Sequence, residues 1–154
     1  VGRIVDTKKI SLDSYVRKYT KKPIPRDLES NMKELLDFLS DEFIENDPLL
    51  RSIGLVPVYF WLGKLSMRVL GEFKIPRSGI FDFEEKRKEN RTLVQGSPVE
   101  DDATVNYDMI EYDRLVQTPN DSYAIRYKCE ILAKYLYTQI EAKKIYSALI
   151  AERG

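Results

Sequence analysis

The chain has no histidine and only one cysteine among its 154 residues. Without histidine it lacks the usual imidazole base, the serine–histidine triads and the commonest zinc ligand, which argues against most hydrolase and metal-enzyme classes. A single cysteine, Cys129, excludes a disulfide within the chain, and its place on a helical apolar stripe predicts a buried thiol rather than a nucleophile. We therefore expect that this chain alone is not an enzyme and that it holds no cofactor and no metal.

Long apolar runs and an excess of either charge are also absent. No stretch of about 18 consecutive apolar residues occurs, and residues 1–6 contain neither an initiator methionine nor a signal-peptide core. Lysine plus arginine and aspartate plus glutamate both total 25, so no net field exists to hold a polyanion. We expect a cytoplasmic protein with no membrane partner, and the start at Val1 suggests a fragment of a longer protein.

Helical periodicity dominates the chain, whereas alternating strand patterns are scarce. The most regular apolar stripe runs from Leu28 to Ile44 and follows Asp27 as its expected cap, and two prolines separate it from a shorter helix before it. A chain of this length buries about 68–70% of its unfolded surface, enough for one core. We therefore predict a single all-α domain of about six helices over residues 1–154.

A continuous apolar run from Leu55 to Leu62 is compatible with either a buried strand or a helix. A helix through Leu70 is favoured, because Pro57 suits a first helical turn and the apolar residues keep a helical period. Only Lys64 and Arg68 are charged in this segment. We expect it to be the central helix, nearly enclosed by the others.

Three more helices are predicted in the second half of the chain. They cover about residues 78–93, residues 105–117, and an unbroken stretch from residue 121 toward the C-terminus. The loop at residues 95–104 carries three adjacent acidic residues. Because they lack the spacing of an EF-hand, a solvated loop is favoured over a cation site.

Polar side chains gather around residues 112–126, which join the last two helices. Pro119 fixes the turn, because it lacks a backbone donor and keeps the preceding residue out of the helical region. Asn120 or Asp121 can cap the helix that follows. The same side chains could form a binding site or could simply clamp two helices, and the clamp is favoured.

Arg87 and Asn90 extend an apolar stripe that should point into the protein. A half-buried arginine requires a carboxylate, and the candidates are Asp113 and Asp121. The candidate polar cluster or binding site comprises Arg87, Asn90, Asp113, Gln117, Asn120, Asp121 and Arg126.

Three segments in order carry a family likeness: DPLLRSIGLVPVYF at residues 47–60, FEEKRKENR at 83–91 and YDRLVQTPND at 112–121. They resemble the helical region that follows the N-terminal domain in GmrSD-type proteins, a large family long catalogued as a domain of unknown function. The likeness covers about residues 40–136. The family has a ParB/sulfiredoxin-like N-terminal domain and often serves in bacterial restriction and phage defence.

Two departures from the family pattern bear on function. The nucleotide-handling and nuclease activity of the family is carried by an Asp-Gly-Gln-Gln-Arg type motif in the N-terminal domain, and the present chain has no such segment and no His-Asn-His nuclease half. The resemblance therefore implies the non-catalytic helical part of a DNA-directed protein. Its partners would be the N-terminal catalytic domain of the same protein and, through the full-length nuclease or NTPase, a nucleic acid or nucleotide.

Two other functions stay open at the level of sequence. One is a stand-alone helical protein-interaction module with no nucleic-acid role, and the other is a small enzyme using Arg87, Asn90, Asp113 and Asp121. An exposed apolar patch would favour an accessory or interaction module. A deep pocket lined by those four residues would favour the enzyme.

Overall fold

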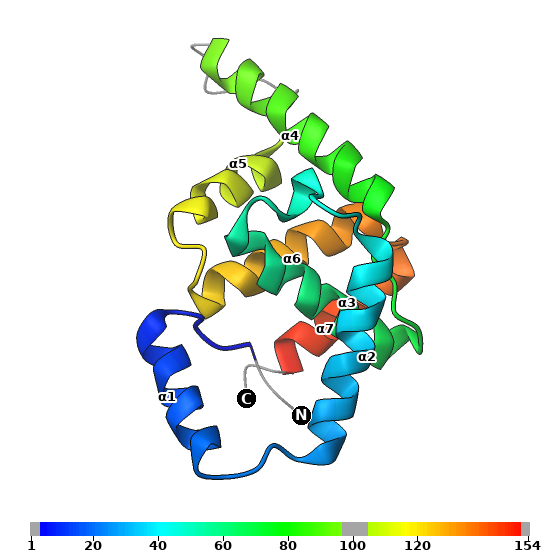
Figure 1. The fold of residues 1–154 in the computed structure, drawn as a ribbon. Coiled ribbons are helices and arrows are strands. Elements are labelled where there is room, and N and C mark those ends of the chain that lie inside the picture. Colours follow the sequence, from blue (N-terminus) through cyan, green and yellow to red (C-terminus); the bar gives the residue numbers. More distant parts are fainter. Residues whose placement is uncertain (1–3, 97–104, 152–154) are drawn as a thin grey trace.

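The computed structural model describes residues 4–96 and 105–151, which form helices and no strand (Figure 1). The elements in order are α1 (Lys9–Thr20), α2 (Arg26–Glu42), the short 3-10 helices η1 (Pro48–Leu50) and η2 (Ile53–Leu55), α3 (Val56–Leu70), α4 (Arg77–Gly96), α5 (Tyr107–Arg114), the 3-10 helix η3 (Leu115–Gln117), α6 (Ser122–Leu136) and α7 (Gln139–Ala151). The predicted all-α fold is confirmed, with seven α-helices in the described ranges where about six were expected.

Helix α3 is the centre of the core, as predicted. It packs against α2, α6 and α7, and Val58, Leu62 and Leu65 are almost fully buried. Pro57 lies in its first turn, and Gly71 ends it in the left-handed conformation at φ 80°. By length and composition the segment Ile53–Leu70 could cross a membrane, but it is also the segment on which α2, α6 and α7 pack, with 44% of it buried.

The predicted unbroken C-terminal helix is wrong, because the chain turns between α6 and α7. The Thr138 backbone nitrogen donates to Glu141 Oε2 at 2.9 Å, and the Glu141 nitrogen donates to Thr138 Oγ1 at 3.4 Å. This reciprocal pair is a capping box, which starts a new helix. Helix α7 can therefore fold back and bury Ile145 and Leu149 against α3 and α6.

Several predicted helix ends also differ. Asp27 lies inside the first turn of α2, and no side chain caps that helix. Helix α4 extends to Gly96 rather than ending near residue 93, and the acidic residues of the predicted loop lie outside the described residues. The expected helix over residues 105–117 is realised as α5 followed by η3, and Asn106 caps it by accepting from the Met109 nitrogen at 3.2 Å.

The regular apolar stripe of α2 is only partly used in the core. Leu35 and Phe43 are buried, whereas Leu28, Met32 and Leu36 are exposed. Figure 1 shows the reason: α1 and the first half of α2 project away from the group of helices formed by α3 to α7. Helix α1 has no buried residue.

Candidate functional site

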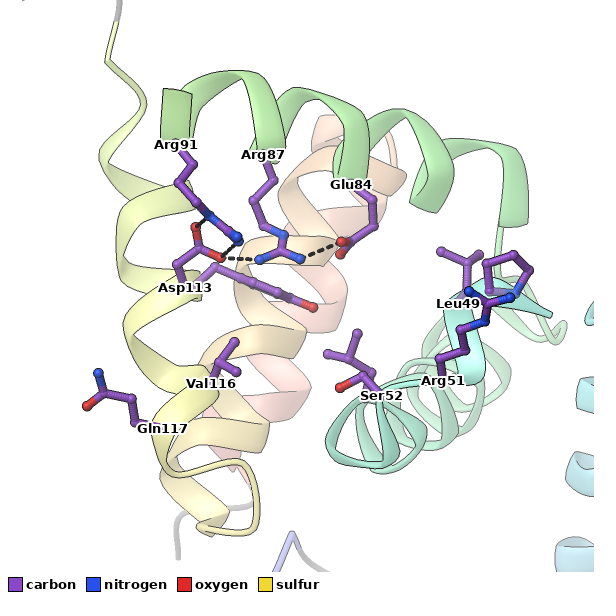
Figure 2. Close-up of a pocket in the computed structure, with 12 residues that line it drawn as sticks. Leu49, Arg51, Ser52, Glu84, Arg87, Arg91, Asp113, Val116 and Gln117 are labelled. Carbon is purple, nitrogen blue, oxygen red and sulfur yellow. Dashed lines mark hydrogen bonds and ion pairs between the residues drawn. The ribbon is translucent and has the colours of Figure 1, made fainter. Parts of the chain in front are cut away.

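A cleft of about 470 Å³ opens between η1 and η2 on one side and α4, α5 and η3 on the other (Figure 2). Twelve residues line it: Pro48, Leu49, Arg51, Ser52, Leu55, Glu84, Arg87, Arg91, Tyr112, Asp113, Val116 and Gln117. All twelve fall within residues 47–60, 83–91 and 112–121. The three segments that carry the family likeness therefore meet at one place.

The η1 wall of the cleft is held by a buried carboxylate. Asp47 is fully buried and accepts from the Leu49 nitrogen at 3.0 Å, from the Ile44 nitrogen at 3.3 Å and from Arg77 Nε at 2.6 Å. Burial raises the pKa of Asp47, whereas the hydrogen-bond donors, with Arg77 foremost, lower it. The donors have the larger effect, so the pKa lies below its ordinary value. Because Arg77 begins α4, this charged contact fixes η1 against the helix that forms the opposite wall.

Gly54 brings the first and third segments into contact. A Cβ atom at this position would lie 2.5 Å from Pro119 Cβ, closer than two non-bonded carbon atoms can approach. Only glycine therefore lets η2 touch the turn before α6 in this arrangement.

Arg87 is the centre of the charged wall shown in Figure 2. Its Nη1 contacts Asp113 Oδ1 and its Nη2 lies 2.5 Å from Glu84 Oε2. Arg91 binds the same Asp113 carboxylate with two nitrogens, at 3.1 and 2.9 Å. The predicted pairing of Arg87 with a carboxylate is confirmed: of the two predicted candidates Asp113 is a partner, and Glu84 is a second partner that was not predicted. Burial lowers the pKa of Arg87, but Glu84 and Asp113 raise it above its ordinary value.

Glu84 and Arg91 line the cleft but were not among the predicted site residues. With Arg87 they occupy positions i, i+3 and i+7 of α4, which lie on one helical face. Lys88, four residues after Glu84, contacts Glu85 instead. The three-residue spacing was the signal that could have identified the charged wall.

Several buried polar atoms at the cleft have no hydrogen-bond partner among the described residues. They are the Tyr112 hydroxyl, Glu84 Oε1 and Arg87 Nε. Burial raises the pKa of Tyr112 well above its ordinary value, so the hydroxyl keeps its proton and remains a donor. Buried polar atoms are normally satisfied, so these three atoms are unpaired exceptions, and they lie beneath the surface of the cleft rather than exposed in it.

Lys128 adds a positive charge behind this wall. It is only 2% exposed, and its Nζ lies 5.4 Å from the Tyr112 ring centroid, while Arg87 lies 5.5 Å from the same centroid. Burial and the Arg87 charge lower the pKa of Lys128. Lys128 lies on the apolar stripe of α6, beside Ile125, Cys129 and Leu132. That position could have indicated from the sequence that its side chain is buried.

We expect Lys128→Met to raise the free energy of unfolding by about 1–2 kcal/mol, because it removes a desolvated charge while keeping an unbranched side chain. The lost contact with the Tyr112 ring offsets only part of this gain. Urea denaturation at neutral pH measures the change. Exposed Lys22→Met is the matched control and should leave the midpoint unchanged. A lower midpoint for Lys128→Met would show that the buried charge stabilises the fold.

Asn90 has a structural role outside the cleft. Its Nδ2 donates to the Asn106 carbonyl at 3.1 Å, and its Oδ1 accepts from the Asn106 nitrogen at 2.7 Å. This pair holds the start of α5 against α4. Asn90 therefore does not join the predicted polar cluster around Arg87 and Asp113, because both polar atoms of its side-chain amide bind the backbone of Asn106.

The turn before α6 binds the N-terminal segment rather than the cleft. Asn120 accepts from the Thr7 nitrogen through its carbonyl at 2.9 Å, and Asp121 pairs with Lys8. Neither Asn120 nor Asp121 caps α6 with its side chain. Asp6 does so by accepting from the Ser122 nitrogen at 2.7 Å, a contact between distant residues that no local pattern could predict.

The remaining predicted residues are separated. Gln117 is exposed at the rim of the cleft, and Arg126 lies on α6 with its Nε buried and without a hydrogen-bond partner in the described part of the chain. Of the four residues in the enzyme hypothesis, only Arg87 and Asp113 meet in the cleft. The constellation proposed for that enzyme is therefore not assembled.

No match to this chain was found among protein-family models, curated proteins or solved structures. Within residues 4–96 and 105–151, no group of three or more cysteine, aspartate or glutamate side chains is placed to hold a metal ion. What the cleft does present is three arginines against two carboxylates.

Proposed function

We propose that this chain is the non-catalytic helical accessory region of a GmrSD-type restriction or defence protein. It packs on a catalytic domain outside this chain and contributes the cleft to a site for a phosphate-bearing ligand, a nucleotide or DNA. The observation that carries the proposal is that every lining residue comes from the three family-like segments. Binding sites are typically concave and carry a few polar groups that converge, as the charged side chains of this cleft do.

The chemistry of the lining suits a phosphate group. Arginine binds phosphate through two parallel N–H donors, and Arg51, Arg87 and Arg91 all line the cleft. Glu84 and Asp113 already neutralise part of this charge, which orients the guanidinium groups and weakens binding to the isolated chain. The two carboxylates of the lining, Glu84 and Asp113, are paired with Arg87 and Arg91, so the proposed role is binding and not turnover.

The test is binding of fluorescent double-stranded DNA and of a labelled nucleoside triphosphate with magnesium, each titrated by anisotropy at low ionic strength. We expect binding without cleavage or hydrolysis, and we expect Arg51→Ala combined with Arg91→Ala to weaken it at least about tenfold. Arg114→Ala removes an exposed arginine outside the cleft and is the matched control. Turnover that follows the chain through a second purification column would contradict the non-catalytic role. Absence of binding to both probes would remove the cleft from the proposal.

A second candidate function is a helical protein-interaction module with no nucleic-acid role. The observation in its favour is the set of exposed apolar side chains on α1 and α2, which the cleft hypothesis does not use. Dimerisation of the chain or binding to a protein partner, together with no affinity for either phosphate probe, would favour this candidate.

A further inference from the structure

We propose that two copies of this chain form a reciprocal dimer in which α1 of each copy packs along α2 of the other. The proposal is independent of the cleft and of its ligand. Three observations carry it: the apolar face of α1, the apolar face of α2, and the opposite charges of the two segments.

Helix α1 presents an apolar face that nothing in the described chain covers. Leu12, Tyr15, Val16 and Tyr19 recur at i, i+3, i+4 and i+7, the spacing of one helical face. Val16 is 65% exposed, and no residue of α1 is buried. A 12-residue helix with this stripe is marginal in water by itself, so it requires a surface on which to pack.

Helix α2 offers a surface of the same kind. Leu28, Met32 and Leu36 lie on one face at i, i+4 and i+8, and Leu36 is 52% exposed. The stripe continues into the core through Leu35 and Phe43. The exposed part is therefore an extension of the apolar core rather than an isolated patch.

The charges of the two segments identify the occupant as a second copy. Residues 8–26, which contain α1, carry seven basic side chains and one acidic one, whereas residues 27–45, which contain most of α2, carry seven acidic and one basic. Of the basic group, Lys8 already pairs with Asp121. An α1 placed on the α2 of another copy brings opposite charges together along its length, and two-fold symmetry repeats the contact.

The same contact within one chain is opposed by the linker. Figure 1 shows that α1 and the first half of α2 project without packing against one another. Pro23 and Pro25 favour extended backbone at the residues before them, which keeps the two helices apart. A second copy can fill both faces without a change in the linker.

The oligomeric state of the full chain tests the proposal, measured by sedimentation velocity across a concentration series. We expect dimers of the 18.0 kDa chain, and we expect Val16→Glu or Leu36→Glu to weaken dimerisation at least about tenfold. Both side chains are exposed in the single chain, so neither substitution should unfold it. Ile10→Glu is the matched control: Ile10 is 85% exposed on α1 but lies off the stripe, and the dimer should persist.

Cross-linking separates the reciprocal dimer from closure within one chain. A mixture of Val16→Cys and Met32→Cys chains should form disulfide-linked pairs under mild oxidation, faster than either variant alone. The native Cys129 is buried and should not compete. A chain that stays monomeric at every concentration, or an equal effect of Ile10→Glu and Val16→Glu, would overturn the proposal. The proposal would also be overturned if a single chain carrying both Val16→Cys and Met32→Cys stayed monomeric and formed the disulfide only within itself.

Discussion

Asp47→Ala is expected to lower the free energy of unfolding by about 3–5 kcal/mol, the largest effect of any single substitution considered for this chain. The substitution leaves the Arg77 guanidinium without its carboxylate and removes the acceptor for the Leu49 and Ile44 nitrogens. Because these contacts join the end of α2, η1 and the start of α4, the cleft wall should loosen with the fold. Urea denaturation at pH 7 measures the loss.

The pH dependence of the same contact gives a second readout. Folding lowers the pKa of Asp47 from its ordinary value of 3.8, so its contribution to stability is complete above that pH. The contribution is lost as the pH falls through the lower folded value. Asp47→Asn should therefore flatten the stability profile below about pH 4. Exposed Glu45→Ala is the control and should change neither the midpoint nor the profile. If the stability of Asp47→Asn fell at acid pH as steeply as that of the unsubstituted chain, the buried ion pair would be contradicted.

Arg87→Ala is expected to lower the free energy of unfolding by about 2–4 kcal/mol. It leaves Glu84 and Asp113 facing one another without the guanidinium that joins them, although Arg91 still holds Asp113. Arg87→Lys keeps the charge but cannot reach both carboxylates with a planar fork, so it should recover only part of the loss.

Stability and ligand binding must be measured together for Arg87, since a clamp and a binding site both predict destabilisation. An unchanged urea midpoint would show that no clamp exists. Destabilisation with unchanged affinity of this chain for both phosphate probes would make the cluster structural only. Loss of affinity in Arg87→Lys, under conditions where it remains folded, is the result expected of a binding role.

Much of the helical framework could be predicted from local patterns. The stripe of α3 and its proline in the first turn identified the central helix, because a helix that packs against several others is apolar over much of its surface and carries few charges. A carboxylate partner for Arg87 was also predictable, since a half-buried arginine must be paired, although the structure gives it two, Asp113 and Glu84. The capping box at Thr138 was readable in the sequence but was missed.

Other features depend on residues that meet only in the folded chain. No spacing along the sequence indicates that Asp6 caps α6 or that Asp47 binds Arg77, because these contacts span 116 and 30 positions. The stripe of α2 likewise gave the helix but not its exposure, which follows from where the body of the protein ends.

The sequence by itself determined which segments are helical and which side chains must avoid isolation in the core, since periodicity and desolvation act locally. Only the tertiary structure decided that three separate segments line one cleft, that Asn90 and Asp121 lie outside it, and that α1 stands apart. The physical reason is that helix packing selects among many arrangements of the same amphipathic faces, and that choice is made by contacts between distant residues.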